Sequence, residues 1–484
     1  MTAPKSRILD AIAALEAGDR RRAASLIRIE LREGAKTGDR WASVYRLASQ
    51  IGEIDLGLEA SHRHAMTEPL LLNRLLTHCG ALAQVGRSTD ALALLDRLPS
   101  QAQSYPAVVH FRGTVASESG DLARAEAIFR QLLEISPASP EGWFALAMIK
   151  RFEPGDPDFP AMAAIERQIQ AADPLSRARF HYAMGKALVD MGEIDRGFAY
   201  YEKGASIRQA QEPYDRIAQE RFTDRVVADF TLDQLNRLKA SRFKSQRAIF
   251  VHGFPRSGTT LVESILVEHS HVSDGAEINL FKAALIPTYD RTFDGAMRYE
   301  SGAPGADPWG EIATDYHRML GQRFPGKGMV VDKTLLQSPF MGLLLHAMPQ
   351  AKVPWLRRRP EDVALSAYRT YFTTPMPWSW SLGDIAHMMQ QEDRLFAHWM
   401  ALFPDRILPV PYEELVRDPD AWIPRILDHV GLEFEAGLDK FHANRRQVRT
   451  ASVQQVRAGI STVAVGSAGR YAAQMAPFRD AYYR

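Results

Sequence analysis

The sequence predicts two parts of different fold class: an all-α region of stacked helix pairs, then a P-loop-like three-layer α/β domain around a parallel sheet. Two observations support this division. Glycines recur at intervals of 34 residues through the first part. After residue 246, apolar strand-like runs alternate with helical stretches. We expect an all-α domain over residues 1–211, a charged helical linker over 212–245 and the α/β domain over 246–484.

Composition narrows the function without identifying it. The 484 residues carry a formal charge of +1, which gives no whole-chain reason to expect nucleic acid or an anionic membrane as partner. Cys79 is the one cysteine, so no intrachain disulfide and no cysteine-rich metal site can form. No run of eighteen apolar residues exists, and the first residues lack the apolar core of a secretory signal. We therefore expect no membrane span and a cytoplasmic location.

The periodic glycines belong to a repeating unit. They are Gly18, Gly52, Gly86 and Gly120. In the clearest unit, Gly113 precedes Gly120 by seven residues. Ala125, Phe129 and Pro137 follow Gly120 by five, nine and seventeen residues. A later copy keeps Gly185, Gly192, Gly197 and Tyr201 at the same offsets. This pattern resembles the tetratricopeptide repeat, in which small residues sit where two antiparallel helices cross.

The function of the repeats stays open at this point. Stacked helix pairs offer a concave surface for a peptide or a partner protein. They could equally form a dimerisation arm, and the sequence does not choose between the two. The stretch "KRFEPGDPDFP" between the clear copies is degenerate, and we expect an irregular connector there.

A candidate phosphate loop opens the second part, in "IFVHGFPRSGTTLVESIL", Ile249 to Leu266. The order is strand, tight loop and helix, so loop amides and the helix N-terminus would point together at an anion. Gly253 and Gly258 have the spacing of the nucleoside-triphosphate loop, but Thr259 stands in place of its lysine. Such a loop can hold a single 5′-phosphate through amides, hydroxyls and Arg256; the alternative is a glycine-rich turn without a ligand.

A second candidate anion site lies in "PWLRRRPEDVALSAY". Arg358 ends a strand and Ser366 lies one turn into the next helix, so both can reach an anion beside the first. A solvated basic cluster is the alternative. Two anion sites at two strand ends fit a ligand with two separated phosphates.

Both segments resemble one family. "FPRSGTTLVE" resembles the 5′-phosphosulfate loop of sulfotransferases, and "RRRPEDVALSAY" resembles their 3′-phosphate segment. With the repeats, the chain is similar to bacterial sulfotransferases that carry tetratricopeptide repeats, relatives of the protein-tyrosine sulfotransferases. The resemblance covers about residues 247–477. It implies 3′-phosphoadenosine-5′-phosphosulfate (PAPS) as donor, the bisphosphate PAP as product, a hydroxyl acceptor and no metal.

The resemblance also implies a role for each matching residue. Glu277 would be the general base, and Lys333, next to an orienting Asp332, would stabilise the oxygen that bridges phosphate and sulfate. Arg256 would lie near the transferring group, and Ser452 near the sulfate. The remaining donor-binding residues are Ser257, Gly258, Thr259, Thr260, Arg358, Ser366 and Tyr412.

Three positions depart from the family pattern. Arg359 stands where the 3′ segment usually has aspartate, and Pro354 falls in a strand expected to be central, where a missing amide is awkward. The family has a loop late in the sequence that normally supplies a basic residue, and here this late loop contains Gly466, Ser467, Ala468 and Gly469. Ser467 stands at the position of the basic residue, and Arg470, three residues on, is the candidate substitute. Loss of that charge would weaken donor binding.

Other features and hypotheses remain. His269 and His271 are two residues apart and do not make a metal triad. Trp378 and Trp380 could line an acceptor pocket or pack on the surface.

The leading function is sulfuryl transfer to a hydroxyl, with protein tyrosine as the favoured acceptor and a glycan, a lipid or a small phenol as open alternatives. The alternatives are a non-catalytic repeat adaptor that retains nucleotide binding and a P-loop phosphotransferase. A polypeptide bound by the repeats and a homodimer are the partners expected besides the donor.

Overall fold

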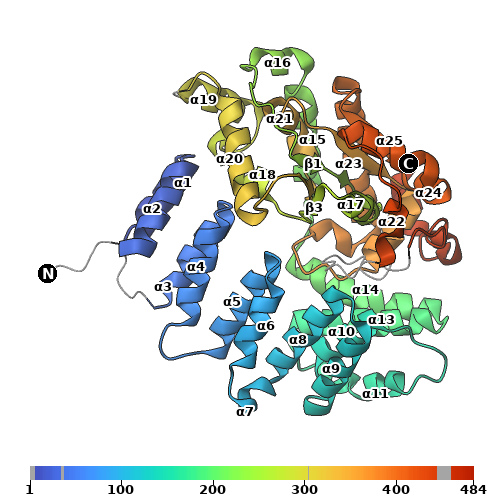
Figure 1. Ribbon diagram of the computed structural model, residues 1–484. Coiled ribbons are helices and arrows are strands. Elements are labelled where there is room, and N and C mark those ends of the chain that lie inside the picture. The colour runs from blue at the N-terminus through green and yellow to red at the C-terminus, as the bar shows by residue number, and fades with distance from the viewer. Residues whose placement is uncertain (1–5, 34–37, 304, 444–458) are drawn as a thin grey trace.

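The computed structural model describes residues 6–33, 38–303, 305–443 and 459–484. It confirms the predicted fold class: an all-α region is followed by a domain with parallel strands. In Figure 1 the helical region, blue to green, curves beneath the α/β domain, which runs from green to red. Within the described residues, no helix is both long and apolar enough to cross a membrane.

The helical region is built from antiparallel pairs. Their bounds are α1 (Ile8–Glu16) with α2 (Arg20–Glu33), α3 (Arg40–Gln50) with α4 (Ile54–Ala65), α5 (Leu72–Gln84) with α6 (Ser88–Asp96), α8 (Pro106–Ser119) with α9 (Leu122–Ile135), and α13 (Pro174–Asp190) with α14 (Ile194–Gln211). The 34-residue glycines all fall in the turn inside a pair. Gly18 has φ +74° and Gly120 has φ +84°. Glycine adopts this left-handed conformation at little energetic cost. Each turn therefore favours a glycine, and the glycines recur at the 34-residue length of the repeat.

Other glycines of the repeat pattern lie where helices cross. A Cβ on Gly113 would stand 2.4 Å from the ring of Phe129, and one on Gly185 would stand 2.9 Å from the ring of Tyr201. The small residue and the aromatic residue of each unit therefore pack against one another, as the repeat pattern predicts. Between these two units the chain is irregular, as expected. It forms α10 (Pro140–Ile149), α11 (Asp158–Ala164) and α12 (Glu166–Ile169), while the short helix α7 (Ser100–Gln103) precedes the first of these two units.

The α/β domain is organised around parallel strands. They are β1 (Ala248–Phe250), β2 (His252–Gly253), β3 (Val272–Asp274), β4 (Met329–Asp332), β5 (Val353–Arg357) and β6 (Ile407–Pro411). The order is β1-β4-β3 in one sheet and β2-β5-β6 in the other, and every pair is parallel. Since β1 and β2 are successive parts of one extended segment, the two sheets are joined along it.

Helices cover both faces of this sheet system. Phe250 and Trp355 pack on one face with α20 (Pro308–Arg323), α21 (Met341–Ala347) and α23 (Leu382–Leu402), whereas Ile249 and Leu356 pack on the other with α17 (Thr259–Glu268) and α25 (Pro419–Val430). Alternate residues of a strand thus face opposite layers, which confirms the three-layer arrangement. The other helices are α18 (Leu280–Ala284), α19 (Phe293–Gly302), α22 (Pro360–Tyr368), α24 (Tyr412–Arg417) and α27 (Ala476–Tyr482), with short 3₁₀ turns η1 (Ile286–Thr288), η2 (Ser338–Phe340), η3 (Pro377–Trp380), η4 (Leu438–Ala443) and η5 (Ser467–Tyr471).

Pro354 lies inside a central strand, and the sheet accommodates it. Its neighbour Val353 donates its N–H to the carbonyl of Arg406, at the start of β6. Successive amides of a strand point to opposite sides, so the nitrogen of Pro354 faces β1. On that side β5 pairs only further along, at Trp355 and Leu356 with β2. The two sheets therefore separate at Pro354, whose backbone nitrogen has no hydrogen to donate to a neighbouring strand.

The expected linker, residues 212–245, forms α15 (Arg216–Asp229) and α16 (Leu232–Arg237). α15 packs along α23, and Arg216 pairs with Asp384 at 2.6 Å. The segment thus lies against the α/β domain. The domain boundaries themselves stay predictions.

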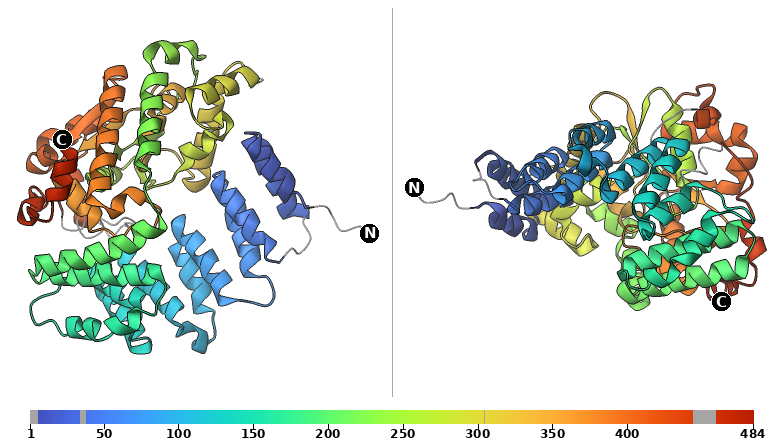
Figure 2. Two further views of the ribbon diagram at one scale, coloured as in Figure 1. Left: turned by 180° about the vertical axis from the view of Figure 1, so that it is seen from behind. Right: turned by 90° about the horizontal axis from the view of Figure 1, so that it is seen from below.

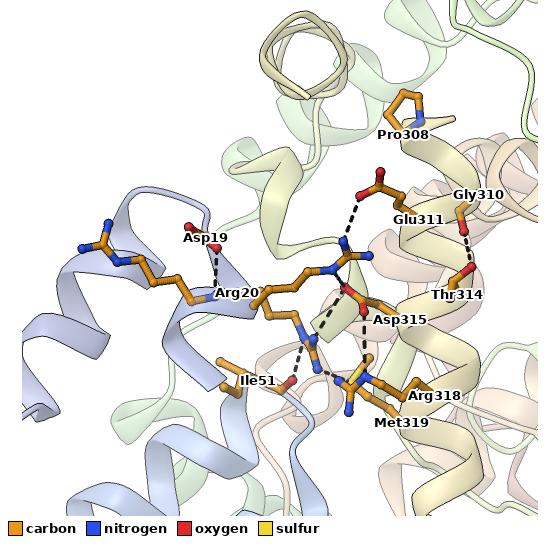
Figure 3. Close-up of polar contacts among 12 residues, drawn as sticks. Asp19, Arg20, Ile51, Pro308, Gly310, Glu311, Thr314, Asp315, Arg318 and Met319 are labelled. Carbon is orange, nitrogen blue, oxygen red and sulfur yellow. Dashed lines mark hydrogen bonds and ion pairs between the residues drawn. The ribbon is translucent and has the colours of Figure 1, made fainter. Parts of the chain in front are cut away.

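The first repeats contact the α/β domain through α20 (Figure 3). Arg20 is 1% exposed; it donates to Glu53 at 2.8 Å and to the carbonyl of Ile51 at 2.9 Å, and it lies 3.7 Å from Asp315 of α20. Arg318 of α20 pairs with the same Glu53. Arg20 and Glu53 are buried and paired, and their contacts with α20 join the N-terminal repeats to the α/β domain.

The last repeat contacts the same domain at a separate place, beneath α22 and α23 (Figures 1 and 2). Tyr182 of α13 packs edge-on against Trp380, with ring centroids 6.1 Å apart, and Arg208 of α14 lies over the same indole at 4.8 Å. The helical region is therefore held on the α/β domain at both of its ends.

Candidate active site

The candidate active site lies at the carboxyl ends of the parallel strands. The phosphate loop follows β2, Glu277 follows β3, Lys333 follows β4, Arg358 follows β5 and Tyr412 follows β6. In open α/β sheets ligands bind at this edge, because every strand delivers a loop there. The structure therefore brings to one edge of the sheet predicted residues as far apart in the sequence as Arg256 and Tyr412.

The phosphate loop has the backbone geometry of a close ligand approach. Gly258 has φ +106°, and a Cβ there would lie 2.5 Å from the ring of Tyr412. Arg256 has φ +75°, a left-handed conformation uncommon for a residue with a side chain. Thr259 and Thr260 open α17 and are buried, at the helix end where the dipole favours an anion.

Positive charge is concentrated beside this loop. Arg256 donates from Nε to the hydroxyl of Ser366 at 2.9 Å, so the predicted 5′ and 3′ segments touch directly. Burial and the neighbouring guanidinium groups of Arg358 and Arg369 lower the pKa of Arg256 to about 10. Such a cluster of like charges is stabilised by an anion among them.

Arg358, beside the phosphate loop, and Ser257, within it, also have groups that fit an anion. Arg358 donates to the carbonyl of Arg256 at 3.2 Å and stacks over Tyr412 at 4.5 Å. The hydroxyl of Ser257 is buried and has no hydrogen-bond partner among the described residues, and neither has Nε of Arg358. Buried polar groups are normally satisfied, so these two fit contacts to a bound anion.

The catalytic pair predicted from the sequence is in contact. Nζ of Lys333 lies 3.0 Å from Oε1 of Glu277 and 3.8 Å from Oε2 of Glu263, which lies on α17. Lys333 and Glu263 are buried, whereas the side chain of Glu277 is 39% exposed. The exposed carboxylate can therefore meet an acceptor from solvent, while the lysine faces inward.

Backbone and buried polar contacts set the position of Lys333. Its N–H donates to the carbonyl of Ala276 at 2.9 Å, which ties the turn after β4 to the turn that carries Glu277. Asp332 accepts hydrogen bonds from Tyr316 at 2.9 Å and from the hydroxyl of Thr334 at 2.6 Å. Asp332 thus orients the segment, and burial raises the pKa of its carboxyl.

The late loop is anchored where the sequence showed a departure. The buried carboxylate of Asp362 accepts from the amides of Gly466 at 2.7 Å and Ala468 at 2.8 Å, and from the hydroxyl of Ser467 at 3.2 Å. Arg358 also donates to the carbonyl of Ala464 at 2.7 Å. Ser467 therefore holds the loop against α22. The exposed Arg470 lies over the ring of Tyr471, 6.0 Å from its centroid, and its role as a substitute for the missing basic residue stays a prediction.

The structure places two further features that the sequence left open. Trp378 and Trp380 are both buried, so neither is a surface residue: the first packs on Phe254 of the phosphate loop, with ring centroids 4.8 Å apart. The histidine pair gains a third possible ligand in Glu435, with ligand atoms of all three within 4.8 Å.

The histidine cluster is already satisfied by hydrogen bonds. Nε2 of His269 lies 3.0 Å from the carbonyl of Glu433, its Nδ1 accepts from the N–H of His271, and Glu435 accepts from the amide of Ser270 at 2.9 Å. These contacts join the start of β3 to the segment after α25. Ser452, predicted near the sulfate, lies outside the residues that the structure describes.

Sequence reasoning missed three residues of this site: Glu263, Asp362 and Arg369. Glu263 had a visible signal, since it is the one carboxylate in the otherwise buried run Thr259–Leu266, where a charge needs a partner. Asp362 and Arg369 had none, because their partners lie about a hundred residues away: Asp362 holds the late loop, and Arg369 donates to Tyr471 at 3.2 Å.

Comparison with known proteins places both parts of the chain. Residues 248–436 match the model of the sulfotransferase family, and residues 107–139 and 178–211 match the tetratricopeptide repeat. An uncharacterized protein of Aquifex aeolicus (strain VF5) is 28% identical over 406 residues, which is 79% of this chain and 50% of that protein. The chain thus spans about half the length of the curated relative it matches.

Solved structures give weaker likenesses. The sulfotransferase domain of the Synechococcus PCC 7002 olefin synthase is 21% identical, with a TM-score of 0.35, over 48% of this chain and 90% of that one. Mouse sulfotransferase SULT7A1, solved with PAP, is 14% identical, with a TM-score of 0.25, over 45% of this chain and 70% of that one. At these scores neither likeness bears on substrate or mechanism. The comparisons thus show a match of residues 248–436 to the sulfotransferase family model, after a helical region in which residues 107–139 and 178–211 match the tetratricopeptide repeat.

Proposed function

We propose that this protein transfers a sulfuryl group from PAPS to an acceptor hydroxyl, and that the acceptor is a tyrosine in a polypeptide. The observation that carries the proposal is the combination of two groups at one sheet edge: the arginine cluster around Arg256 and the Lys333–Glu277 pair. The first fits an anionic donor, and the second fits base-assisted transfer to a hydroxyl.

The donor contacts follow from the residues present. Loop amides, Ser257, Thr259 and Thr260 would hold the 5′-phosphate at the N-terminus of α17. Arg358 and Ser366 would hold the 3′-phosphate. Because Arg256 donates a hydrogen bond to Ser366, the two phosphate subsites would lie directly beside one another. The loop has no lysine at the position of Thr259, which disfavours γ-phosphoryl transfer from a triphosphate.

The transfer would be an in-line displacement at sulfur. The acceptor oxygen forms a bond to sulfur while the bond from sulfur to the bridging oxygen of the 5′-phosphosulfate breaks. Glu277 takes the hydroxyl proton, and Lys333 stabilises the negative charge that develops on the bridging oxygen. Both groups come from turns that share a backbone hydrogen bond, so their relative position is set before substrates bind.

The choice of a polypeptide acceptor rests on the repeats. Helix pairs of this kind commonly present a concave surface to a peptide. Here they are fixed at both ends on the domain that carries Glu277, through Arg20 and through Tyr182. A peptide bound by the repeats would therefore be held at a defined place relative to the base.

The test is transfer of ³⁵S from labelled PAPS to tyrosine-containing peptides, assayed without magnesium beside small phenols and glycans. We expect labelled tyrosine, and a fall in turnover of about 10²–10⁴-fold in Glu277→Gln, the usual contribution of a general base. Lys333→Met should be impaired comparably. The matched controls Glu433→Gln and Lys327→Met change exposed residues and should keep wild-type rates. Full turnover in Glu277→Gln and Lys333→Met would refute the assigned site, and label on a glycan alone would refute the tyrosine acceptor.

A further inference from the structure

Lys333 contacts two carboxylates, and the proposed reaction uses only one of them. Glu277 comes from the turn after β3, at 3.0 Å, and Glu263 comes from the middle of α17, at 3.8 Å. Glu263 is 2% exposed and Lys333 is 1% exposed. A carboxylate buried to this degree is costly to charge unless a cation neutralises it.

The two carboxylates differ in what they can do. Glu277 is partly exposed and can reach an acceptor, whereas Glu263 lies on the helix that begins at the phosphate loop and has no access to solvent. When Glu277 accepts a proton it becomes neutral and no longer balances the lysine. A buried lysine without a counter-charge tends to lose its own proton. The lysine would then fail to stabilise the leaving oxygen at the step where that charge is needed.

We propose that Glu263 is a positioning residue: it holds Lys333 protonated and directed at the donor while Glu277 exchanges its proton with the acceptor. By sharing the lysine, it also weakens the hold of Lys333 on Glu277 and so frees the base for the acceptor. This inference rests on the proposed function for its purpose, but the contact on which it depends exists without any ligand.

The charged groups that face Lys333 are consistent with this role. They are Glu263 from α17, Glu277 from the turn after β3, and Asp274 at the end of β3. Burial lowers the pKa of Lys333, but Glu263 and then Glu277 raise it, and the net pKa lies above the ordinary lysine value. Removal of Glu263 should therefore let Lys333 titrate at lower pH.

The first experiment measures the affinity of 3′,5′-adenosine bisphosphate by calorimetry between pH 6.5 and 9.5. We expect wild-type affinity to stay flat, and Glu263→Gln to match it near pH 6.5 but to bind at least tenfold more weakly at pH 9.5. Glu263→Asp should restore most of the flat profile. Glu268→Gln, on the same helix, is the control and should behave as wild type. A flat profile in Glu263→Gln would overturn the inference, while absence of binding by the wild-type protein would instead count against the proposed function.

A second experiment needs no ligand, because it compares thermal midpoints. Lys333→Met removes the cation beside the buried Glu263, so adding Glu263→Gln to that variant should raise its thermal midpoint. In the wild-type background, Glu263→Gln should lower the midpoint. Equal changes in both backgrounds would show that the two residues are not coupled and would overturn the inference.

Discussion

Ser467 donates its hydroxyl to Oδ1 of Asp362 at 3.2 Å, and the same carboxylate accepts the amides on either side of that serine. The late loop is thus held by α22, which also carries Ser366 of the proposed 3′-phosphate subsite. A serine at this position contributes to loop position rather than to charge. The positive charge of the subsite comes instead from Arg256, Arg358 and Arg369.

Asp362→Ala should therefore destabilise the protein more than Ser467→Ala. Asp362 is buried and its charged hydrogen bonds involve two amides, so we expect a loss of about 3 kcal/mol in the free energy of unfolding. Ser467→Ala removes one longer bond and should cost about 1 kcal/mol or less. Urea denaturation of both variants measures the difference. Equal losses would show that the carboxylate does not anchor the loop.

Arg358→Met should weaken binding of 3′,5′-adenosine bisphosphate. A charge-assisted hydrogen bond contributes about 1.5–3 kcal/mol, which corresponds to a roughly 10- to 150-fold rise in Kd. Binding of 5′-AMP, which lacks the 3′-phosphate, should change much less. Arg417→Met, an exposed arginine on α24, is the control for loss of a charge. Calorimetry with both nucleotides gives the comparison, and equal weakening for the two ligands would place Arg358 elsewhere than at the 3′-phosphate.

Arg20→Met should lower the thermal midpoint far more than Arg21→Met, although the two arginines are adjacent. Arg20 is 1% exposed and contacts Glu53 and the carbonyl of Ile51, whereas Arg21 is 54% exposed and forms surface pairs with α20. Breaking a buried pair costs about 3–5 kcal/mol, and exposed pairs contribute about 0–1 kcal/mol. Differential scanning calorimetry distinguishes the two. Similar midpoints would mean that the N-terminal repeats are not fixed through Arg20.

Stability should fall as pH rises between about 4.5 and 7, because of Glu392. This buried residue of α23 accepts a hydrogen bond from Ser338 at 2.6 Å, and burial raises the pKa of its carboxyl to about 7 from 4.5. The folded state therefore binds the proton more tightly than the unfolded state, so the stabilisation is complete below pH 4.5 and is lost as pH rises through 7. Glu392→Gln should remove this part of the pH dependence. A denaturation series at several pH values in both proteins tests it, and identical slopes would assign the dependence to other groups.

The fold class followed from the sequence because its signals are local. Gly18 and Gly120 fall in turns that require positive φ, and Gly258 begins the helix that a phosphate loop predicts. The predicted residues of the candidate site came from short motifs, and two of them, Lys333 and Glu277, do lie in contact. Asp362 and Arg369 could not be foreseen, since their partners come from distant segments that only the folded chain brings together. The sequence indicated that Pro354 is unfavourable in a central strand. It could not show that the sheet splits beside this residue, because the split depends on the register of β5 with β2.

The most direct test of the central claim is the thermal midpoint of the whole chain with 3′,5′-adenosine bisphosphate, compared with ADP and with magnesium-ATP. A ligand present at a hundred times its Kd should add about 2.7 kcal/mol to the stability of the folded state. We predict a clear rise with the bisphosphate and little change with the other two. A rise with magnesium-ATP alone would contradict the assignment of two separate phosphate subsites and would indicate a phosphotransferase instead.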